Sequence, residues 1–128
     1  QREGAHMNLL DIITKLNLKP LTSIDSDLSL IKPTCGYTSD LLSCVMAGAP
    51  KKSIWVTLQA HGNIIAVAAL LDLSAVIITE GAQPDESSIE KANEEGVLLL
   101  STPLPTYEVV GKLWEMGLRS PDPDQASS

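Results

Sequence analysis

One stretch of the chain, residues 53–81, constrains the fold more than any other. An apolar run of strand length at 54–58 is followed by a polar break at 59–63 and a second apolar run at 64–71. A β-branched run then follows at 75–79. Strand, helix and strand in this order predict a βαβ unit with parallel strands and a right-handed crossover. Both predicted strands are continuously apolar, which indicates burial on both faces of the sheet.

Predicted helices and strands alternate on either side of this unit. Asn8 and Asp11 fit a capping box at the start of a first helix, and Asp85 fits the N-cap of a polar helix at 86–95. A last helix should bury an apolar stripe formed by Tyr107, Val110, Leu113 and Trp114. Further strands are predicted at residues 18–22, 28–37 and 97–100. The alternation predicts a three-layer α/β/α domain with a mainly parallel sheet of about five strands.

The remaining residues are expected to flank one domain. Residues 1–7 resemble the remnant of an expression tag, residues 8–118 suffice for a single core, and the polar residues 119–128 predict a disordered tail. No apolar segment approaches the roughly 18 residues of a membrane span, and no signal peptide pattern occurs. We therefore expect a cytoplasmic protein with no membrane contact.

Charge and cysteine content exclude several classes of partner. The net charge is −7 and the nine basic residues are scattered, which argues against nucleic-acid binding, because such binding depends on Lys and Arg neutralising phosphates. Two cysteines, Cys35 and Cys44, favour a reducing compartment and small buried thiols. Outside the tag, His61 is a lone histidine, so the sequence predicts no metal site and no cofactor.

Four segments carry a family resemblance. They are GYTSDLLSCVMA at 36–47, WVTLQAHGNIIAVA at 55–68, IITEG at 77–81 and LLST at 99–102. Together they resemble the DRTGG domain family, and the resemblance extends over residues 8–118. Thr79-Glu80-Gly81 is the nearest match to the Thr-Gly-Gly part of the family signature, with Glu80 in place of a glycine.

The resemblance implies a regulatory or assembly module that does not itself catalyse a reaction. Similar domains form the amino-terminal domain of bacterial HPr kinase/phosphorylase, a middle region of long phosphotransacetylases and an insert beside CBS modules in some pyrophosphatases. Stand-alone domains of this kind resemble small proteins found near iron-hydrogenase genes. The resemblance thus implies a homodimer, and a larger hydrogenase or phosphotransfer enzyme as a partner.

The polar break after the first strand of the βαβ unit is the main candidate site. It places Gln59, His61, Gly62 and Asn63 at the carboxyl end of a parallel strand, where open α/β sheets bind ligands. We expect Asn63 to be the N-cap of the following helix, whose backbone donors and dipole favour an anion. His61 would bind a phosphate or carboxylate, and Gln59 would read a base or amide edge. The alternative is that these residues only form a turn and a cap.

Other polar residues lie just past neighbouring strand ends and should line the same rim. Hydroxyls and backbone donors there would hold an anion, and Glu80 would bind a ribose hydroxyl or a cation. These rim residues are Thr79, Glu80, Gly81, Ser101 and Thr102. Tyr37, Ser39 and Asp40 form a secondary cluster at a strand-to-helix turn, which helix capping by Ser39 and Asp40 explains without a ligand.

The sequence lacks the parts of a kinase. Phosphoryl transfer needs a glycine-rich phosphate loop with a lysine, and no G-x-x-x-x-G-K-[ST] pattern occurs. A small enzyme based on His61 is a weaker hypothesis, because no second general acid or base is spaced to work with it. The sequence favours a non-catalytic module that binds an adenine nucleotide or a phosphate-like anion. The alternative is a module that docks on a larger redox or phosphotransfer enzyme without a small ligand.

Overall fold

The computed structural model describes residues 7–122 and confirms the predicted α/β architecture. None of the helices in this range is long and apolar enough to cross a membrane. The elements follow in the order α1 (Leu9–Leu16), β1 (Lys19–Pro20), the 3₁₀ turn η2 (Leu28–Leu30), β2 (Gly36–Thr38), α2 (Leu42–Gly48), β3 (Ile54–Thr57), α3 (Asn63–Leu71), β4 (Ala75–Ile78), α4 (Glu86–Glu95), β5 (Leu99–Ser101) and α5 (Thr106–Glu115). Residues 1–6 of the expected tag and residues 123–128 of the predicted tail lie outside the described residues.

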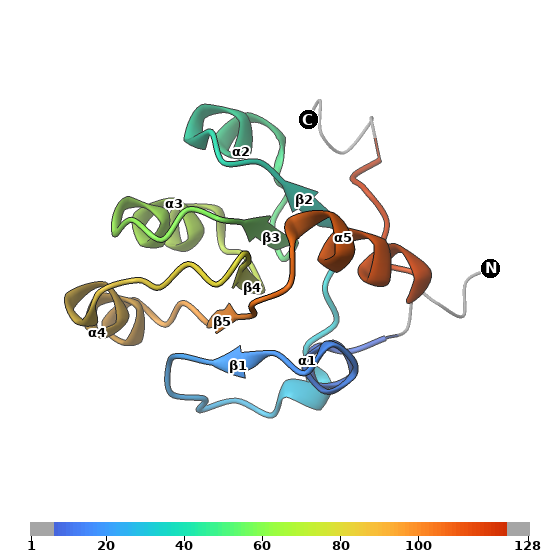
Figure 1. Cartoon of the computed structure of the whole chain (residues 1–128), viewed down its shortest axis with the longest axis horizontal. Helices are drawn as coiled ribbons and strands as arrows, with labels where there is room; N and C mark the ends of the chain where they lie inside the picture. Colours follow the sequence, from blue (N-terminus) through green and yellow to red (C-terminus); the bar gives the residue numbers. More distant parts are fainter. Residues whose placement is uncertain (1–6, 123–128) are drawn as a thin grey trace.

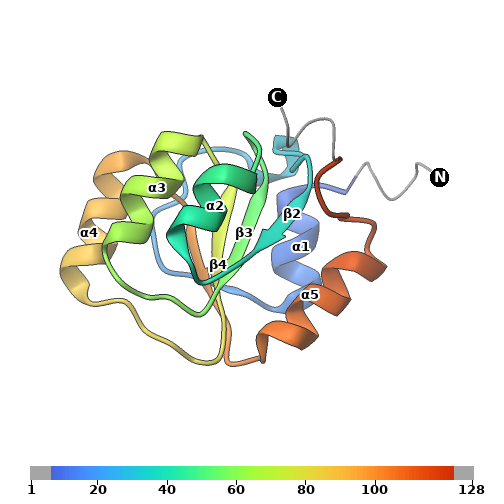
Figure 2. The same ribbon diagram turned by 90° about the horizontal axis from the view of Figure 1, so that it is seen from above.

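The five strands form one sheet in the order β1-β5-β4-β3-β2. Strands β2 to β5 are parallel, and the two-residue strand β1 pairs antiparallel with β5. Helices α2, α3 and α4 cover one face, and α1 and α5 cover the other, so that Figure 1 shows three layers with the strands in the middle. Figure 2 shows the same separation of the helices from above.

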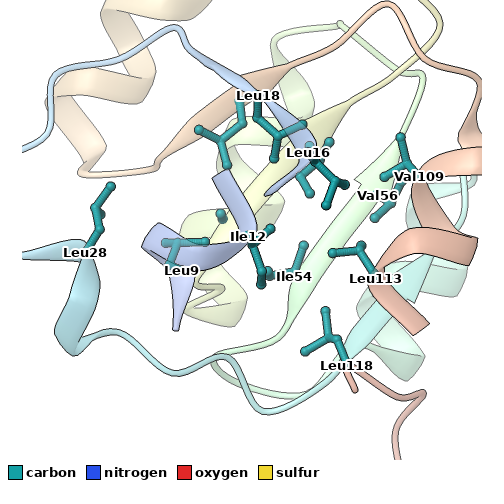
Figure 3. Close-up of a cluster of buried hydrophobic side chains, with 13 residues drawn as sticks. Leu9, Ile12, Leu16, Leu18, Leu28, Ile54, Val56, Val109, Leu113 and Leu118 are labelled. Atoms are coloured by element: carbon teal, nitrogen blue, oxygen red, sulfur yellow. The ribbon is translucent and has the colours of Figure 1, made fainter. Parts of the chain in front are cut away.

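The central strands β3 and β4 divide the apolar core into two halves. Every residue of both strands is buried, and alternate side chains point to opposite faces. Trp55 points toward α2 and α3, whereas Ile54 and Val56 point toward α1 and α5. The cluster on the α1 and α5 face is drawn in Figure 3. Continuous apolar strands are thus required because helices cover both faces.

Helix ends follow the sequence in some places and not in others. The capping box of Asn8 and Asp11 is present, and Asp85 caps α4 as predicted. The predicted stripe of α5 is partly wrong, because Tyr107 is 93% exposed and Trp114 is 46% exposed. The helix begins at Thr106, and its buried face contains Val109 and Leu113, so it is rotated relative to the predicted stripe. Periodicity marked the helix, but its rotation is set by how it packs on the sheet.

The path of the chain decides where a crevice can form. From β2 to β5 each crossover steps to the next strand with its helix on the same face. After β5 the chain passes to the other face, where α5 packs over β3. The loops that leave β4 and β5 therefore diverge to opposite faces. That divergence, between β4 and β5, is where open α/β sheets form ligand crevices.

Candidate functional site

The predicted site residues lie at the carboxyl ends of strands β2 to β5, and hydrogen bonds join their loops in two pairs. The loop after β2 is bonded to the end of β3, and the loop after β4 is bonded to the loop after β5. The central strands join the two pairs, since the Thr79 backbone N–H donates to the Thr57 carbonyl over 2.9 Å. We call this whole edge, formed by the loops after β2 to β5, the rim.

Asp40 joins the first pair of loops instead of capping a helix. Its carboxylate accepts hydrogen bonds from the Thr57 hydroxyl at 2.7 Å and from the Leu58 backbone N–H at 2.9 Å. The N-cap of α2 is Leu41, and no side chain caps that helix. The predicted capping role of Asp40 is therefore wrong. An anionic acceptor is held more strongly by two donors at the end of β3 than by the first turn of a seven-residue helix.

Ser39 and Tyr37 also have structural partners. The Ser39 hydroxyl accepts a hydrogen bond from the Leu41 backbone N–H, a local turn rather than a helix cap. Its carbonyl accepts a hydrogen bond from the Trp55 indole N–H at 2.9 Å. The Tyr37 hydroxyl donates to the Cys44 carbonyl, and its ring packs on the core below α2. The secondary cluster thus fastens the edge strand β2 to the rest of the sheet.

The elbow between β3 and α3 differs from the prediction at its helix start. Asn63 is the first residue of α3 and does not cap it; the N-cap is Gly62, and α3 has no side-chain cap. Gly62 has helical backbone angles, and a Cβ there would lie 3.1 Å from the Ser88 hydroxyl. The start of α3 therefore packs close to the start of α4. Gln59 is held by two hydrogen bonds, because its Nε2 donates to the Asp40 carbonyl in the loop after β2 and its backbone N–H donates to the Thr57 hydroxyl at the end of β3.

His61 is exposed at this elbow, close to Asp85. Asp85 caps α4, and hydrogen bonds from Ser88 and Ser87 hold the pKa of its carboxyl below its usual value. The charge of His61 adds a smaller contribution in the same direction, which places the imidazole within electrostatic reach of Asp85. The elbow therefore combines an exposed imidazole with a helix N-terminus that no side chain caps.

The position between β4 and β5, where a ligand crevice would be expected, is spanned by the chain itself. The Glu80 backbone N–H donates to the Leu104 carbonyl at 2.9 Å, and Gly81 donates to the Thr102 carbonyl at 3.1 Å. The Glu80 side chain then crosses the gap, and its Oε2 accepts a hydrogen bond from the Thr106 backbone N–H at 2.8 Å. Glu80 does this from a left-handed backbone conformation, with φ of 62°. A carboxylate of the protein therefore occupies the N-terminus of α5.

The threonine and serine hydroxyls predicted to converge on a ligand lie inside the structure. Thr79 is fully buried, and its hydroxyl is 2.5 Å from the Thr106 hydroxyl. Ser101 and Thr102 are also buried, and the Thr102 hydroxyl accepts from the Leu104 backbone N–H. These residues support the rim from below. Of the predicted site, the exposed members are Asp40, His61, Asn63, Glu80 and Gly81.

Sequence reasoning missed two residues on which the rim depends. The Thr57 hydroxyl donates to the Asp40 carboxylate and accepts from the Gln59 backbone N–H, which joins the first pair of loops. Thr106 hydrogen-bonds the hydroxyl of Thr79 and donates its backbone N–H to the carboxylate of Glu80. A threonine at the end of a buried strand, and another directly after Pro105 at a helix start, were the available signals. Within residues 7–122, no group of three or more His, Cys, Asp or Glu side chains is arranged to hold a metal ion.

A solved structure shares this fold. It is the crystal structure of the CBS and DRTGG domains of the regulatory region of Clostridium perfringens pyrophosphatase, complexed with its activator, diadenosine tetraphosphate. The two chains share 16% sequence identity and superpose with a TM-score of 0.70. The match covers 94% of this chain and 53% of that chain, so this chain spans about half of the structure it resembles. No curated protein sequence matches the chain significantly.

The family comparison agrees with the resemblance noted in the sequence. The model of the DRTGG domain matches residues 42–116, from the start of α2 to the end of α5. This range contains the elbow, the Glu80 turn and the loop after β5, and it leaves out α1, β1 and β2. Because the match covers more than half of the sequence, this chain belongs to the DRTGG domain family.

Proposed function

We propose that this protein is a regulatory module that senses a small anionic ligand, of nucleotide or phosphate type, at the elbow between β3 and α3. The observation that carries the proposal is the N-terminus of α3, which no side chain caps and which begins beside the exposed His61. Membership of the DRTGG family supports a regulatory role. The related regulatory region that binds diadenosine tetraphosphate makes adenine nucleotides the first ligands to test.

The chemistry of the elbow fits an anion of modest size. The first backbone N–H groups of a helix carry a partial positive charge and are natural donors to phosphate or carboxylate oxygens. His61 and Asn63 are exposed at this helix start, and Gln59 is held in place by two hydrogen bonds. Glu80 would repel an anion between the loops after β4 and β5, so the proposed site is smaller than the whole rim and centres on His61, Gly62 and Asn63.

We propose that the module acts by binding and not by catalysis. His61 has Asp85 as its acidic neighbour, and Asp85 is already engaged in capping α4. General acid–base catalysis needs a second group placed to exchange a proton with the substrate. A cytoplasmic location belongs to the same proposal, supported by the free thiols of Cys35 and Cys44, which persist in reducing compartments.

A second candidate function is docking on a larger redox or phosphotransfer enzyme without a small ligand. Leu41 and Leu58 flank Asp40 on the rim and are 61% and 44% exposed. Large apolar side chains that gather on an exposed edge are typical of protein contacts. A homodimer is part of the proposal as well, because β2 is a sheet edge and edges are commonly covered by a partner.

The test is a titration of the ¹⁵N-labelled protein with AMP, ADP, ATP, diadenosine polyphosphates, acetyl phosphate and inorganic phosphate. Binding at the elbow predicts saturable shifts of the Gly62 and Asn63 amides and at least fivefold weaker binding in His61→Ala. The Tm of the same samples should rise by several degrees, because a ligand at a hundred times its Kd stabilises the folded state by about 2.7 kcal/mol.

One control variant and one refuting outcome make this result decisive. Lys91→Ala removes a charged side chain from α4, a helix adjacent to the elbow, and should leave the affinity unchanged. If no ligand at millimolar concentration shifts any amide resonance, the sensing proposal is wrong. Capture of a redox or phosphotransfer enzyme that Leu41→Glu abolishes would then support the docking function, and light scattering at several concentrations would settle whether the chain forms a dimer.

A further inference from the structure

We infer that the groove between the edge strand β2 and helix α5 is a second binding site, for a small organic anion with an apolar body. This site is separate from the elbow and does not depend on the proposed function. The groove encloses about 270 Å³. Its lining residues are Gly36, Tyr37, Thr38, Val56, Val110, Leu113, Trp114, Leu118, Arg119, Ser120 and Pro121.

The groove exists because β2 presents small side chains to this face. Tyr37 points to the α2 face of the sheet, so the alternate residues Gly36 and Thr38 are left on the α5 face. Helix α5 packs over β3 instead and does not fill the space beside them. The chain after α5 closes the far wall, where Leu118 lies 3.2 Å from the position of a Cβ on Gly36.

The lining of the groove is mostly apolar and includes a cationic residue. Val56, Val110, Leu113 and Leu118 provide aliphatic walls. Arg119 and Trp114 also line the groove, and the Arg119 guanidinium lies 4.5 Å from the centre of the Trp114 ring. The Arg119 backbone is held as well, because its carbonyl accepts a hydrogen bond from Gly36 at 2.8 Å. A guanidinium that stacks on an aromatic ring keeps its N–H donors at its edge, in a fork that matches a carboxylate.

These features select the class of ligand. A groove of about 270 Å³ is large enough for a short aliphatic or aromatic chain. The apolar walls exclude a phosphate-rich ligand, because its charges would be desolvated without partners. Arg119 is the one charged residue among the described residues that line the groove, and it favours one carboxylate over a neutral or positive head group. A medium-chain or aromatic carboxylic acid satisfies each of these conditions.

The test uses three matched probes, octanoate, octanol and octylammonium, added to the full chain with ¹³C-labelled methyl groups. Binding in the groove predicts saturable shifts of the Val110, Leu113 and Leu118 methyls with octanoate, weaker shifts with octanol and none with octylammonium. Quenching or a shift of Trp114 fluorescence should follow the same order, while the fully buried Trp55 should not respond.

Variants separate charge recognition from apolar partition. Arg119→Gln keeps the backbone bond to Gly36 and should weaken octanoate about tenfold, the ratio expected for loss of one charged hydrogen bond, with octanol unchanged. Lys112→Gln, the matched control, removes a positive charge from α5 outside the groove and should change neither. Val110→Phe should fill the groove and abolish binding of both probes.

The outcomes that overturn the inference are equally defined. Octanoate that leaves the three methyls unmoved up to its solubility, or octylammonium that binds as well as octanoate, would exclude this site. If Arg119→Gln and Lys112→Gln weaken octanoate binding equally, the effect comes from overall charge, and this result would also exclude the site. If Val110→Phe does not fold, the comparison of Arg119→Gln with Lys112→Gln still decides the question.

Discussion

Glu80 offers the sharpest test of how the rim is built, because two opposing effects act on one residue. Its carboxylate caps α5 through the Thr106 backbone N–H, and loss of such a cap costs about 1 kcal/mol. Its backbone is left-handed, with φ of 62°, a conformation that costs a non-glycine residue about 1 kcal/mol more than glycine. Glu80→Ala loses the cap and keeps the strain, whereas Glu80→Gly loses the cap and relieves the strain.

Glu80→Ala should therefore have a lower free energy of unfolding than both Glu80→Gly and the natural protein, which should be similar to each other. We expect Glu80→Ala to lower the free energy of unfolding by about 1 kcal/mol, equivalent to about 4 °C in Tm for a domain of this size. Glu80→Gly should stay within about 0.5 kcal/mol of the natural protein, because the two effects offset each other. Glu80→Gln keeps an acceptor but loses the charge at the helix N-terminus, so it should fall between them.

Urea unfolding monitored by circular dichroism measures all three differences, and equal slopes in urea would show that the denatured states are comparable. Glu80→Ala as stable as the natural protein would refute the capping argument, and Glu80→Gly less stable than Glu80→Ala would refute the strain argument. A phosphate titration of Glu80→Gly gives an independent check. If the carboxylate occupies an anion position, its removal should produce a phosphate-dependent shift of the Thr106 amide that the natural protein lacks.

Three further predictions follow from the described contacts. Gly111 lies in an exposed turn of α5 with open space around it, so Gly111→Ala should stabilise the protein by about 0.4–1 kcal/mol. Gly48→Ala should destabilise it, because the new Cβ would lie 2.7 Å from the tyrosine ring packed against α2. Thermal unfolding should show a higher Tm for the first variant and a lower Tm for the second. A thiol reagent should modify one cysteine quickly in the folded protein, the exposed Cys44, and the second only after unfolding, since burial raises the pKa of the Cys35 thiol; fast release of two equivalents would contradict this. The pKa of Asp85 is lowered in the folded state, so its contribution to stability is present above the ordinary value of 3.8 and is lost as the pH falls through the folded value. Asp85→Asn, which keeps a capping oxygen, should therefore lose less stability between about pH 5 and about pH 3 than the natural protein, as measured by urea unfolding.

The order and class of the helices and strands could be predicted from the sequence alone. Residues 54–58 and 75–79 could be assigned to buried strands because a run of apolar side chains is stable only when both faces are covered. The N-caps at Asn8 and Asp85 were predictable for a similar reason, since each satisfies a donor three residues away in the chain. These features depend on local spacing, and local spacing can be read directly from the chain.

The contacts between loops, in contrast, depend on the tertiary structure. Asp40 was expected to cap its own helix, but it bonds Leu58, 18 residues away, because adjacent parallel strands bring those two loops together. Glu80 bonds Thr106, 26 residues away, because the chain changes face after β5 and sets the start of α5 beside the turn after β4. The groove beside β2 has the same origin, since its walls come from β2 and from α5 with the residues after it, which are far apart in the sequence. Short-range patterns specify helices and strands, but the order of strands and the faces of the crossovers determine which side chains share a site.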